Sequence, residues 1–393
     1  MQIDSQELII LLEQLDMEVK SSGLCGYDPR LFWYLPAAKL YHKKKNKLTN
    51  FLRKIEVAAY RTMPLLIKPY LKISNINQSI SPYGLGLAIQ AYVNYYRIFK
   101  EEKYLASAIE IETVLKGFLI TTTSKNIGVP TPPEDDSVSS LPAGAEVALS
   151  YIDLFEITQK NYYLSQAIKI ANSFIFDHRI KYLTENRIAI DYYSNNDGLH
   201  VLNANALAAV VFHRLNVINN TLPYQNYIDG IVNYILPYLD YEKLPYSGVE
   251  DRNNKNVIWN SYDLYHTGFV LCALLKIAKH NNNKQLIELL YKQYQFLINN
   301  FIVGEKIIVL PHRNVVDIHG LAEFIKVFSE YDGQSEYIFK LIYKNIMYMK
   351  KNNTFYYQRG KTKIFMYMPR WSHFPMMLSI SHLLTALQSH SNN

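Results

Sequence analysis

Apolar positions along the chain recur with helical spacing, and the helical segments they mark come in pairs joined by short polar turns. Residues 85–99 and 104–119 form one pair. Residues 145–157 and 162–176 repeat it, and the second members of the two pairs share the string Tyr-Leu-x-x-Ala-Ile. The pattern therefore predicts consecutive helical hairpins.

Three more hairpins are predicted further along the chain: 205–217 with 224–238, 269–279 with 285–301, and 321–331 with 336–349. The last apolar helical segment, 374–387, has no following partner. We expect the N-terminal segment 35–70 to pair with it and close the set.

A short signature stands at the head of six long apolar helical segments. The signatures are Ser81-Pro82-Tyr83-Gly84, Leu141-Pro142-Ala143-Gly144, His200-Val201-Leu202-Asn203, Tyr265-His266-Thr267-Gly268, Asp317-Ile318-His319-Gly320 and Arg370-Trp371-Ser372-His373. One marker residue in each signature gives intervals of 60, 59, 65, 52 and 52 positions, a length that fits one hairpin with its connections. The markers are Gly84, Gly144, Asn203, Gly268, Gly320 and Ser372. We predict an all-α, (α/α)6-type toroid that forms a single domain over residues 1–393. The first turns of its equivalent helices would gather at one end, where a binding site would form.

The spacing of apolar residues becomes alternating in a few connecting stretches: 187–192, 306–310, 355–357 and 364–367. These predict short β-hairpins over one end of the ring. Three prolines exclude a helix from the loop 128–137, for which we expect a rigid lip beside the cavity.

Composition narrows the class of protein. The chain has 393 residues, 49% of them hydrophobic, and only two cysteines, too few for a disulfide framework. Its start lacks the basic-then-apolar pattern of a signal peptide, and no apolar run is long enough to span a bilayer. We expect a cytoplasmic protein without a transmembrane segment, so that any membrane association would be peripheral or through a partner.

The formal charge of +7 is weak evidence for nucleic-acid binding, because Lys and Arg are spread over many segments. Nucleic acid is therefore not an expected partner. A mildly basic field is compatible with an acidic glycan.

The segment that ends in Asp263-Leu264-Tyr265-His266 concentrates polar groups before an apolar helix. Asp263 has the residue type of a helix N-cap, and we favour that role for it. A helix N-terminus disfavours a protonated imidazole, so His266 would be neutral and usable as a base. The alternative for His266 is a core histidine bonded to a backbone carbonyl.

Two later signatures add related groups. Asp317 and His319 repeat the acid and imidazole, with the same alternatives of a cap and a core histidine. Arg370 and Trp371 combine a cation with an indole, a pairing that can bind a carboxylate and stack on a sugar. The alternative is an Arg paired with a neighbouring Asp, with Trp371 in the core.

Other polar groups are weaker candidates. Asn203 and Asn205 do not share a helix face, so at most one would point inward. The acidic loop that contains Asp136 could supply a general acid or be a solvated loop. His200 and His373 stand with His266 and His319 at the ring end, but the HExxH spacing of a metal site is missing. No nucleotide-binding loop or nucleophile elbow is present, so the sequence predicts neither a metal nor a cofactor.

The residues resemble a family of bacterial α/α-toroid proteins associated with exopolysaccharide, capsule and lipopolysaccharide biosynthesis, which is distantly similar to D-glucuronyl C5-epimerases and six-hairpin glycosidases. The resemblance rests on the strings Gly26-Tyr27-Asp28-Pro29, Asn203-Ala204-Asn205-Ala206-Leu207-Ala208-Ala209, Tyr265-His266-Thr267-Gly268-Phe269, Asp317-Ile318-His319 and Arg370-Trp371-Ser372. Tyr262 to His266 is also similar to the Tyr-Asp-Leu-x-His string of the epimerases, with Tyr265 where those enzymes usually have arginine. The resemblance implies a sugar-related role.

Two hypotheses follow. The first is an enzyme of surface-polysaccharide biosynthesis that acts on a uronic-acid-containing oligosaccharide by epimerisation, elimination or hydrolysis. The roles we assign are proton transfer for His266 and Tyr265, carboxylate binding for Arg370, stacking for Trp371 and Tyr27, and orientation or a second acid/base role for Asp317 with His319. The further candidates for substrate binding are Asp28, Asp136, Asp191, Tyr192, His200, Asn203, Asp263 and His373. The second hypothesis is a non-catalytic subunit that holds a lipid-linked glycan beside a glycosyltransferase.

Overall fold

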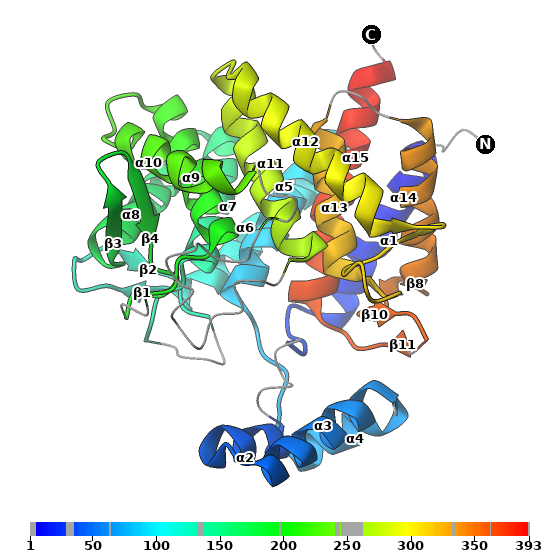
Figure 1. Ribbon diagram of the computed structural model, residues 1–393. Helices are drawn as coiled ribbons and strands as arrows, with labels where there is room; N and C mark the ends of the chain where they lie inside the picture. Colours follow the sequence, from blue (N-terminus) through cyan, green and yellow to red (C-terminus); the bar gives the residue numbers. More distant parts are fainter. Residues whose placement is uncertain are drawn as a thin grey trace.

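The computed structural model describes residues 5–28, 35–62, 64–131, 137–195, 198–239, 244, 262–331, 335–361 and 363–391. Six of the described helices stand side by side in a closed inner ring (Figure 1). These are α5 (Pro82–Phe99), α7 (Leu141–Thr158), α9 (Leu202–Ile218), α11 (Leu264–His280), α13 (Ile318–Glu330) and α15 (Phe374–Ser391). Contacts between α15 and α5 complete the ring. The predicted toroid is confirmed.

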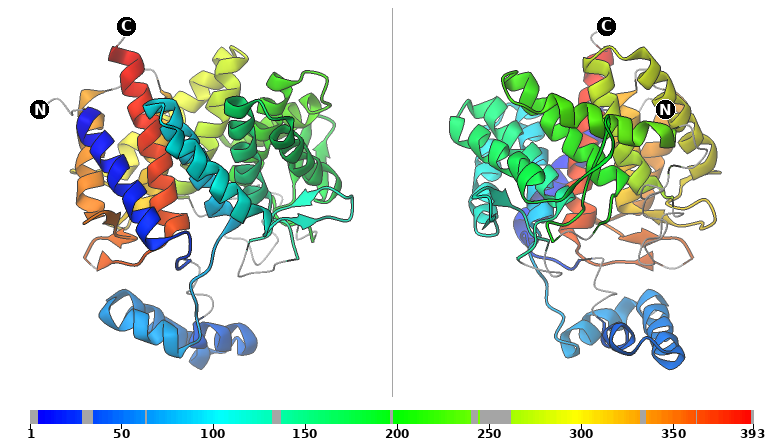
Figure 2. Two further views of the ribbon diagram at one scale, coloured as in Figure 1. Left: turned by 180° about the vertical axis from the view of Figure 1, so that it is seen from behind. Right: turned by 60° about the vertical axis from the view of Figure 1, so that its left-hand side comes forward.

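An outer layer of helices covers this ring. Its members are α6 (Glu102–Lys116), α8 (Asn161–Phe176), α10 (Gln225–Leu239), α12 (Lys284–Phe301) and α14 (Glu336–Met349), each packed against the inner helix that precedes it. The partner of α15 is α1 (Ser5–Ser22), and Figure 2 shows the two side by side.

Our prediction that residues 35–70 close the ring was wrong. That region forms α2 (Pro36–Lys44), α3 (Lys47–Thr62) and α4 (Pro64–Ile73), which lie apart from the ring (Figures 1 and 2). We call residues 36–73 the helical excursion. The place we gave it belongs to α1, whose Leu8, Leu12 and Leu15 are fully buried in the main core. The excursion packs instead in a small separate cluster.

Short strand pairs occupy the connections, as the alternating stretches predicted. They are β1 (Ile120–Thr121) with β2 (Ile127–Gly128), β3 (Ile180–Thr184) with β4 (Arg187–Ile190), β5 (Ile302–Val303) with β6 (Lys306–Ile307), β8 (Lys350–Lys351) with β9 (Thr354–Phe355), and β10 (Gln358–Arg359) with both β7 (Val316–Asp317) and β11 (Lys363–Ile364). All of these pairs are antiparallel.

The loops that follow these strands cap the starts of inner helices. In three cases the first N–H group of an inner helix donates to a carbonyl in the connection that follows the hairpin begun by that same helix. The pairs are Leu141 to Tyr192, Leu264 to Val309 and Ile318 to Tyr357, at 2.9, 3.1 and 3.2 Å. Since these N–H groups have no partner within their own helix, each connection is drawn over the same end of the ring.

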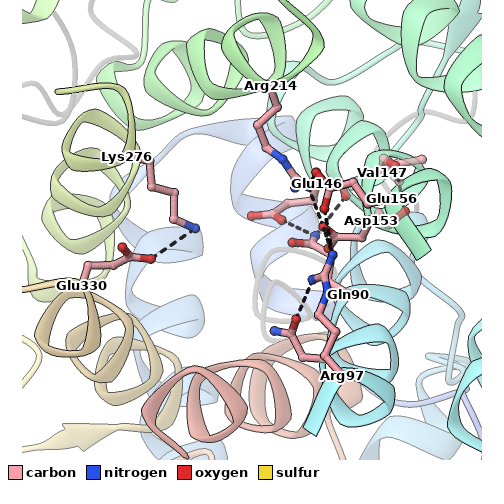
Figure 3. Close-up of polar contacts among 11 residues, drawn as sticks. Gln90, Arg97, Glu146, Val147, Asp153, Glu156, Arg214, Lys276 and Glu330 are labelled. Atoms are coloured by element: carbon pink, nitrogen blue, oxygen red, sulfur yellow. Dashed lines mark hydrogen bonds and ion pairs between the residues drawn. The ribbon is translucent and has the colours of Figure 1, made fainter. Parts of the chain in front are cut away.

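Ion pairs link neighbouring inner helices at the other end (Figure 3). Arg214 of α9 lies 2.9 Å from Asp153 and 2.5 Å from Glu156, both on α7. Arg97 of α5 lies 2.8 Å from the same Glu156. These groups come from the C-terminal halves of their helices, so the two ends of the ring differ in chemistry. No helix in the described part of the chain is both long and apolar enough to cross a membrane.

Close approach of inner helices depends on glycine. A Cβ atom on Gly86 would lie 3.1 Å from backbone atoms of Glu146 on the adjacent α7. We therefore expect Gly86→Ala to lower the free energy of unfolding by about 1–3 kcal/mol, because backbone must shift. Gly117→Ala is the control, since the nearest atom would be 3.4 Å away and Gly117 has an ordinary helical φ of −66°. Urea denaturation compares the two, and equal stabilities would contradict the packing.

Candidate functional site

His266 lies in the first turn of α11 and is held by the residue that caps this helix. The Asp263 Oδ1 accepts the backbone N–H of His266 at 2.8 Å, and Asp263 Oδ2 lies 2.7 Å from His266 Nδ1. Burial alone would raise the pKa of Asp263, but His266 and nearby backbone N–H groups outweigh burial and lower it. An ionised Asp263 keeps the proton on Nδ1, so proton exchange with a ligand falls to Nε2.

Two adjoining hollows meet at this histidine. The inner recess has a volume of about 40 Å³ and is lined by Thr131, Tyr192, Asn203, Tyr265, His266 and Arg370 among others. The outer cavity has a volume of about 370 Å³ and is lined by Tyr265, His266, Arg313, Asp317, Gln358 and Trp371 among others. Because Tyr265 and His266 line both, the two hollows form one site at the N-terminal end of the inner helices.

Three buried polar atoms around the inner recess have no hydrogen-bond partner within the described residues. They are Thr131 Oγ1, Asn203 Oδ1 and Arg370 Nε. Most buried polar groups in folded proteins are paired, and an unpaired one calls for an explanation. Three such atoms around one recess suit a ligand that carries several polar groups.

Arg370 is fixed between an acid and an aromatic ring. Its Nη1 donates to Asp28 Oδ2, and its guanidinium lies 4.9 Å from the centre of the Tyr83 ring. Asp28 is almost fully buried, so it neutralises much of the charge of Arg370. The predicted cation is therefore present at the site, but with a protein carboxylate already beside it. This is the pairing with a nearby Asp that the sequence left open.

Asp317 is the N-cap of α13 and also lines the outer cavity. Its Oδ1 accepts the backbone N–H groups of His319 and Gly320 and the Trp371 Nε1–H, while its Oδ2 accepts from Gln358 at 2.9 Å. Burial raises the pKa of Asp317 to about 6, although these donors act against the rise. The predicted cap is confirmed, and the same contacts hold Trp371 and Gln358 in the wall of the outer cavity.

His319 lies beneath the site and is fully buried. Its ring centre is 4.2 Å from that of Tyr265 and 4.5 Å from that of Trp371. Burial holds its pKa well below the usual range, so the imidazole is neutral. Neither ring nitrogen has a hydrogen-bond partner among the described residues. The packing supports two walls of the site and places the imidazole behind them, so His319 is a core residue but lacks, within the described residues, the carbonyl bond of the core-histidine alternative.

A buried ion cluster below His319 escaped the sequence analysis. Lys326 Nζ lies 2.7 Å from Glu323 Oε1, and on α7 the nearby Glu146 accepts a hydrogen bond from Gln90 at 2.8 Å. Burial raises the pKa of Glu323 and of Glu146. The available signal was spacing, because His319, Glu323 and Lys326 recur on one face of an otherwise apolar helix.

Three of the predicted substrate-binding residues are used elsewhere, and these assignments need correction. His200 Nε2 lies 2.9 Å from Asp191 Oδ1 in a buried pair that joins β4 to the start of α9. His373 is fully buried, with its Nδ1 and Nε2 bonded to the hydroxyls of Ser372 and Thr354. Asp191, His200 and His373 therefore line neither the inner recess nor the outer cavity.

The remaining candidates divide by position. Tyr192 and Asn203 line the inner recess, whereas the Asn205 side chain bonds the backbone of Ile190, so only one of the two asparagines points inward, as predicted. Tyr27 lines a small depression on the other side of Arg370, together with Asp28. Asp136 and the rest of residues 132–136, half of the proline-rich loop, lie outside the described residues.

The repeat register predicts that His266 and Arg370 lie at the same end of the ring, and the structure confirms this. His266 and Arg370 are more than one hundred positions apart in the sequence, yet both line the inner recess. Within the described residues, no group of three or more His, Cys, Asp or Glu side chains is arranged to hold a metal ion.

Comparison with known proteins identifies proteins that share the fold of this chain, but no relative in sequence. No family model matches the chain, and no curated protein matches it in sequence. Solved structures do match. One is a family 76 glycoside hydrolase, an α-mannanase from Bacteroides thetaiotaomicron, with 11% identity over 81% of this chain and 90% of that one, at a TM-score of 0.61.

Two epimerases are equally similar. A cellobiose 2-epimerase from Bacillus thermoamylovorans has 12% identity over 79% of this chain and 88% of that one, at a TM-score of 0.60. A sugar epimerase from a ruminal bacterium has 11% identity over 78% and 87%, at a TM-score of 0.62. At such identities the likeness shows the fold, which this chain shares with several carbohydrate-processing enzymes.

The raised pKa of Asp317 predicts how stability depends on pH. The folded protein retains a proton that the unfolded chain releases between about pH 4 and 6, so this group destabilises the fold as pH rises through that window. A pKa difference of this size between the folded and unfolded states corresponds to about 3 kcal/mol of unfolding free energy. Between pH 4 and 7 we therefore expect the unmodified protein to lose about 3 kcal/mol of unfolding free energy relative to Asp317→Asn. Denaturation at several pH values measures it.

The exposed Asp229 provides the control, because Asp229→Asn should leave the pH profile unchanged. Parallel profiles for Asp317→Asn and the unmodified protein would show that folding does not raise the pKa of Asp317.

Proposed function

We propose that this protein is a carbohydrate-processing enzyme that moves a proton to or from a sugar bound in the inner recess and outer cavity. The observation that carries the proposal is the Asp263–His266 pair. Its imidazole borders a recess whose walls hold unpartnered polar atoms. A histidine oriented through Nδ1 by a carboxylate is suited to general acid/base catalysis at Nε2. The shared fold with mannanases and sugar epimerases supports the same class of substrate.

Tyr265 is suited to the opposite role. Burial raises the pKa of its phenol far above neutrality, so the hydroxyl keeps its proton. A protonated phenol can donate a hydrogen bond or a proton to a sugar oxygen, while His266 accepts a proton from the reacting position. The two residues are neighbours in sequence, and their ring centres lie 4.7 Å apart. They therefore offer an acid and a base at one site.

Epimerisation or elimination fits these groups better than hydrolysis. A typical glycosidase uses two carboxyl groups that flank the scissile bond. The two carboxylates of the outer cavity, Asp263 and Asp317, each use one oxygen to cap a helix and the other to hold a side chain. Both are committed to structure, whereas the imidazole and phenol are placed for proton transfer.

The finer part of the proposal is a uronic-acid-containing oligosaccharide of bacterial surface-polysaccharide biosynthesis. Abstraction of a proton beside a carboxylate needs positive charge to stabilise the enolate. Arg370 lies in the same recess as His266, and its Nε–H is unpartnered within the described residues. This N–H can bind a sugar carboxylate while Asp28 holds the other side of the guanidinium.

A second candidate is a non-catalytic subunit that holds a lipid-linked glycan for a glycosyltransferase. The pairing of Arg370 with Asp28 favours it, because the balanced charge stabilises an enolate less than a lone cation would. The two candidates differ in what loss of the imidazole would do.

We expect His266→Ala to lower turnover by about 10²- to 10⁴-fold, because a general base is removed. Substrate affinity should change little. The melting temperature should stay within a few degrees, since the His266 side chain is 30% exposed. The assay incubates the protein with defined acidic oligosaccharides in deuterated water. Deuterium at C5 reports epimerisation, and an unsaturated sugar reports elimination.

His280→Ala is the matched control, because His280 is an exposed histidine near the other end of the same helix. Unchanged turnover in His266→Ala would remove the catalytic assignment. Glycan binding by the unmodified protein without deuterium uptake, cleavage or unsaturation would favour the non-catalytic subunit.

A further inference from the structure

The helical excursion is strongly basic. Residues 36–73 contain ten of the 41 basic residues of the chain and one of its 34 acidic residues, a formal charge of +9. Since the whole chain carries +7, everything outside the excursion sums to −2. Outside the excursion, acidic residues balance the basic ones in sum, although residues 337–393 of the toroid also hold eight basic and no acidic residues.

The one carboxylate of the excursion is used internally. Glu56 accepts the backbone N–H groups of Ala37 and Ala38 at the start of α2 and the hydroxyl of Tyr70. It therefore ties α3 to α2 and α4. The side chains of Lys39, Lys43, Lys44, Lys45, Lys47 and Lys54 are all exposed.

An exposed apolar stripe runs along α3 beside these cations. Leu48, Phe51, Leu52 and Ile55 are 66, 59, 39 and 50% exposed. Their spacing places them within an arc of about 100° on the helix, and Lys47 and Lys54 flank the arc on one side. An apolar face bordered by lysines is the pattern of a helix that lies in a membrane interface.

The base of the excursion packs beside the site. Leu35 and Leu71 belong to a small buried cluster with Tyr357 and Ile364, and Tyr357 also lines the outer cavity. In Figure 1 the excursion lies beyond the end of the ring that carries β10 and β11. A surface that bound α3 would therefore lie on the same side of the molecule as the site.

We propose that the helical excursion docks this protein on the surface of an anionic lipid bilayer, with the α3 stripe in the interface and the lysines on lipid headgroups. Charge complementarity selects this occupant. A second copy of the chain would bring two surfaces of +9 together, which like-charge repulsion disfavours. A nucleic-acid duplex would use the cations but has no comparable use for the exposed leucine and isoleucine side chains. The proposal does not depend on the proposed reaction.

The test is co-sedimentation of the full chain with vesicles. We expect binding to phosphatidylcholine vesicles that contain about one third phosphatidylglycerol, and binding at least about 10-fold weaker to pure phosphatidylcholine. Salt of roughly 0.5 M should weaken the binding to anionic vesicles. Phe51→Ser with Ile55→Ser, and separately Lys43→Glu with Lys44→Glu and Lys45→Glu, should each lower the affinity at least about 10-fold.

Matched controls change the same kinds of group on the toroid. Phe176→Ser with Tyr182→Ser removes two aromatic side chains that are 66 and 65% exposed. Reversal of Lys160, Lys169 and Lys284 to Glu changes the net charge as much as the lysine variant does, also at exposed positions. Both controls should bind anionic vesicles like the unmodified protein, and melting temperatures of all variants should agree within a few degrees.

Three results would overturn the proposal. The first is no binding to anionic vesicles, or equal losses in the controls. The second is a dimer that Phe51→Ser with Ile55→Ser converts to a monomer, which would assign the stripe to a second copy. The third is tighter binding to a short RNA or DNA duplex than to anionic vesicles. Because no turnover is measured, none of these results bears on the proposed reaction.

Discussion

The structure depends on how the buried starts of the inner helices satisfy their backbone N–H groups. The first turn of any helix has donors without partners in that helix, and here water is largely excluded by neighbouring helices. Side-chain caps satisfy some of these donors, and at three helices a carbonyl from the connection after the same hairpin satisfies the first one. This requirement fixes the register between successive hairpins. It also draws polar side chains and short strands to one end of the ring.

The candidate site is largely a product of this capping. Asp263 and Asp317 each give one carboxylate oxygen to the helix and the other to a side chain of the site, His266 in one case and Gln358 in the other. Local chain direction and site geometry are therefore set by the same residue. A change at either aspartate would alter both, whereas His266 can be replaced with less effect on the fold.

The sequence predicted the ring because every inner helix carries a signature at its start and a helical apolar pattern behind it. It could not tell which rim histidines face the cavity, since the burial of His200 and His373 depends on partners such as Asp191 and Thr354 that lie elsewhere in the sequence. The excursion was mistaken for a ring hairpin because its apolar spacing is equally helical.

The closure of the ring by α15 has a consequence for biosynthesis. This helix is synthesised after the other five helices of the inner ring and after α1, yet it packs against α5, α13 and α1. Until it emerges, the inner faces of those helices lack their neighbour and expose apolar surface, the condition under which nascent chains aggregate or recruit chaperones. A truncation that removes α15 would therefore leave the ring open between α13 and α5.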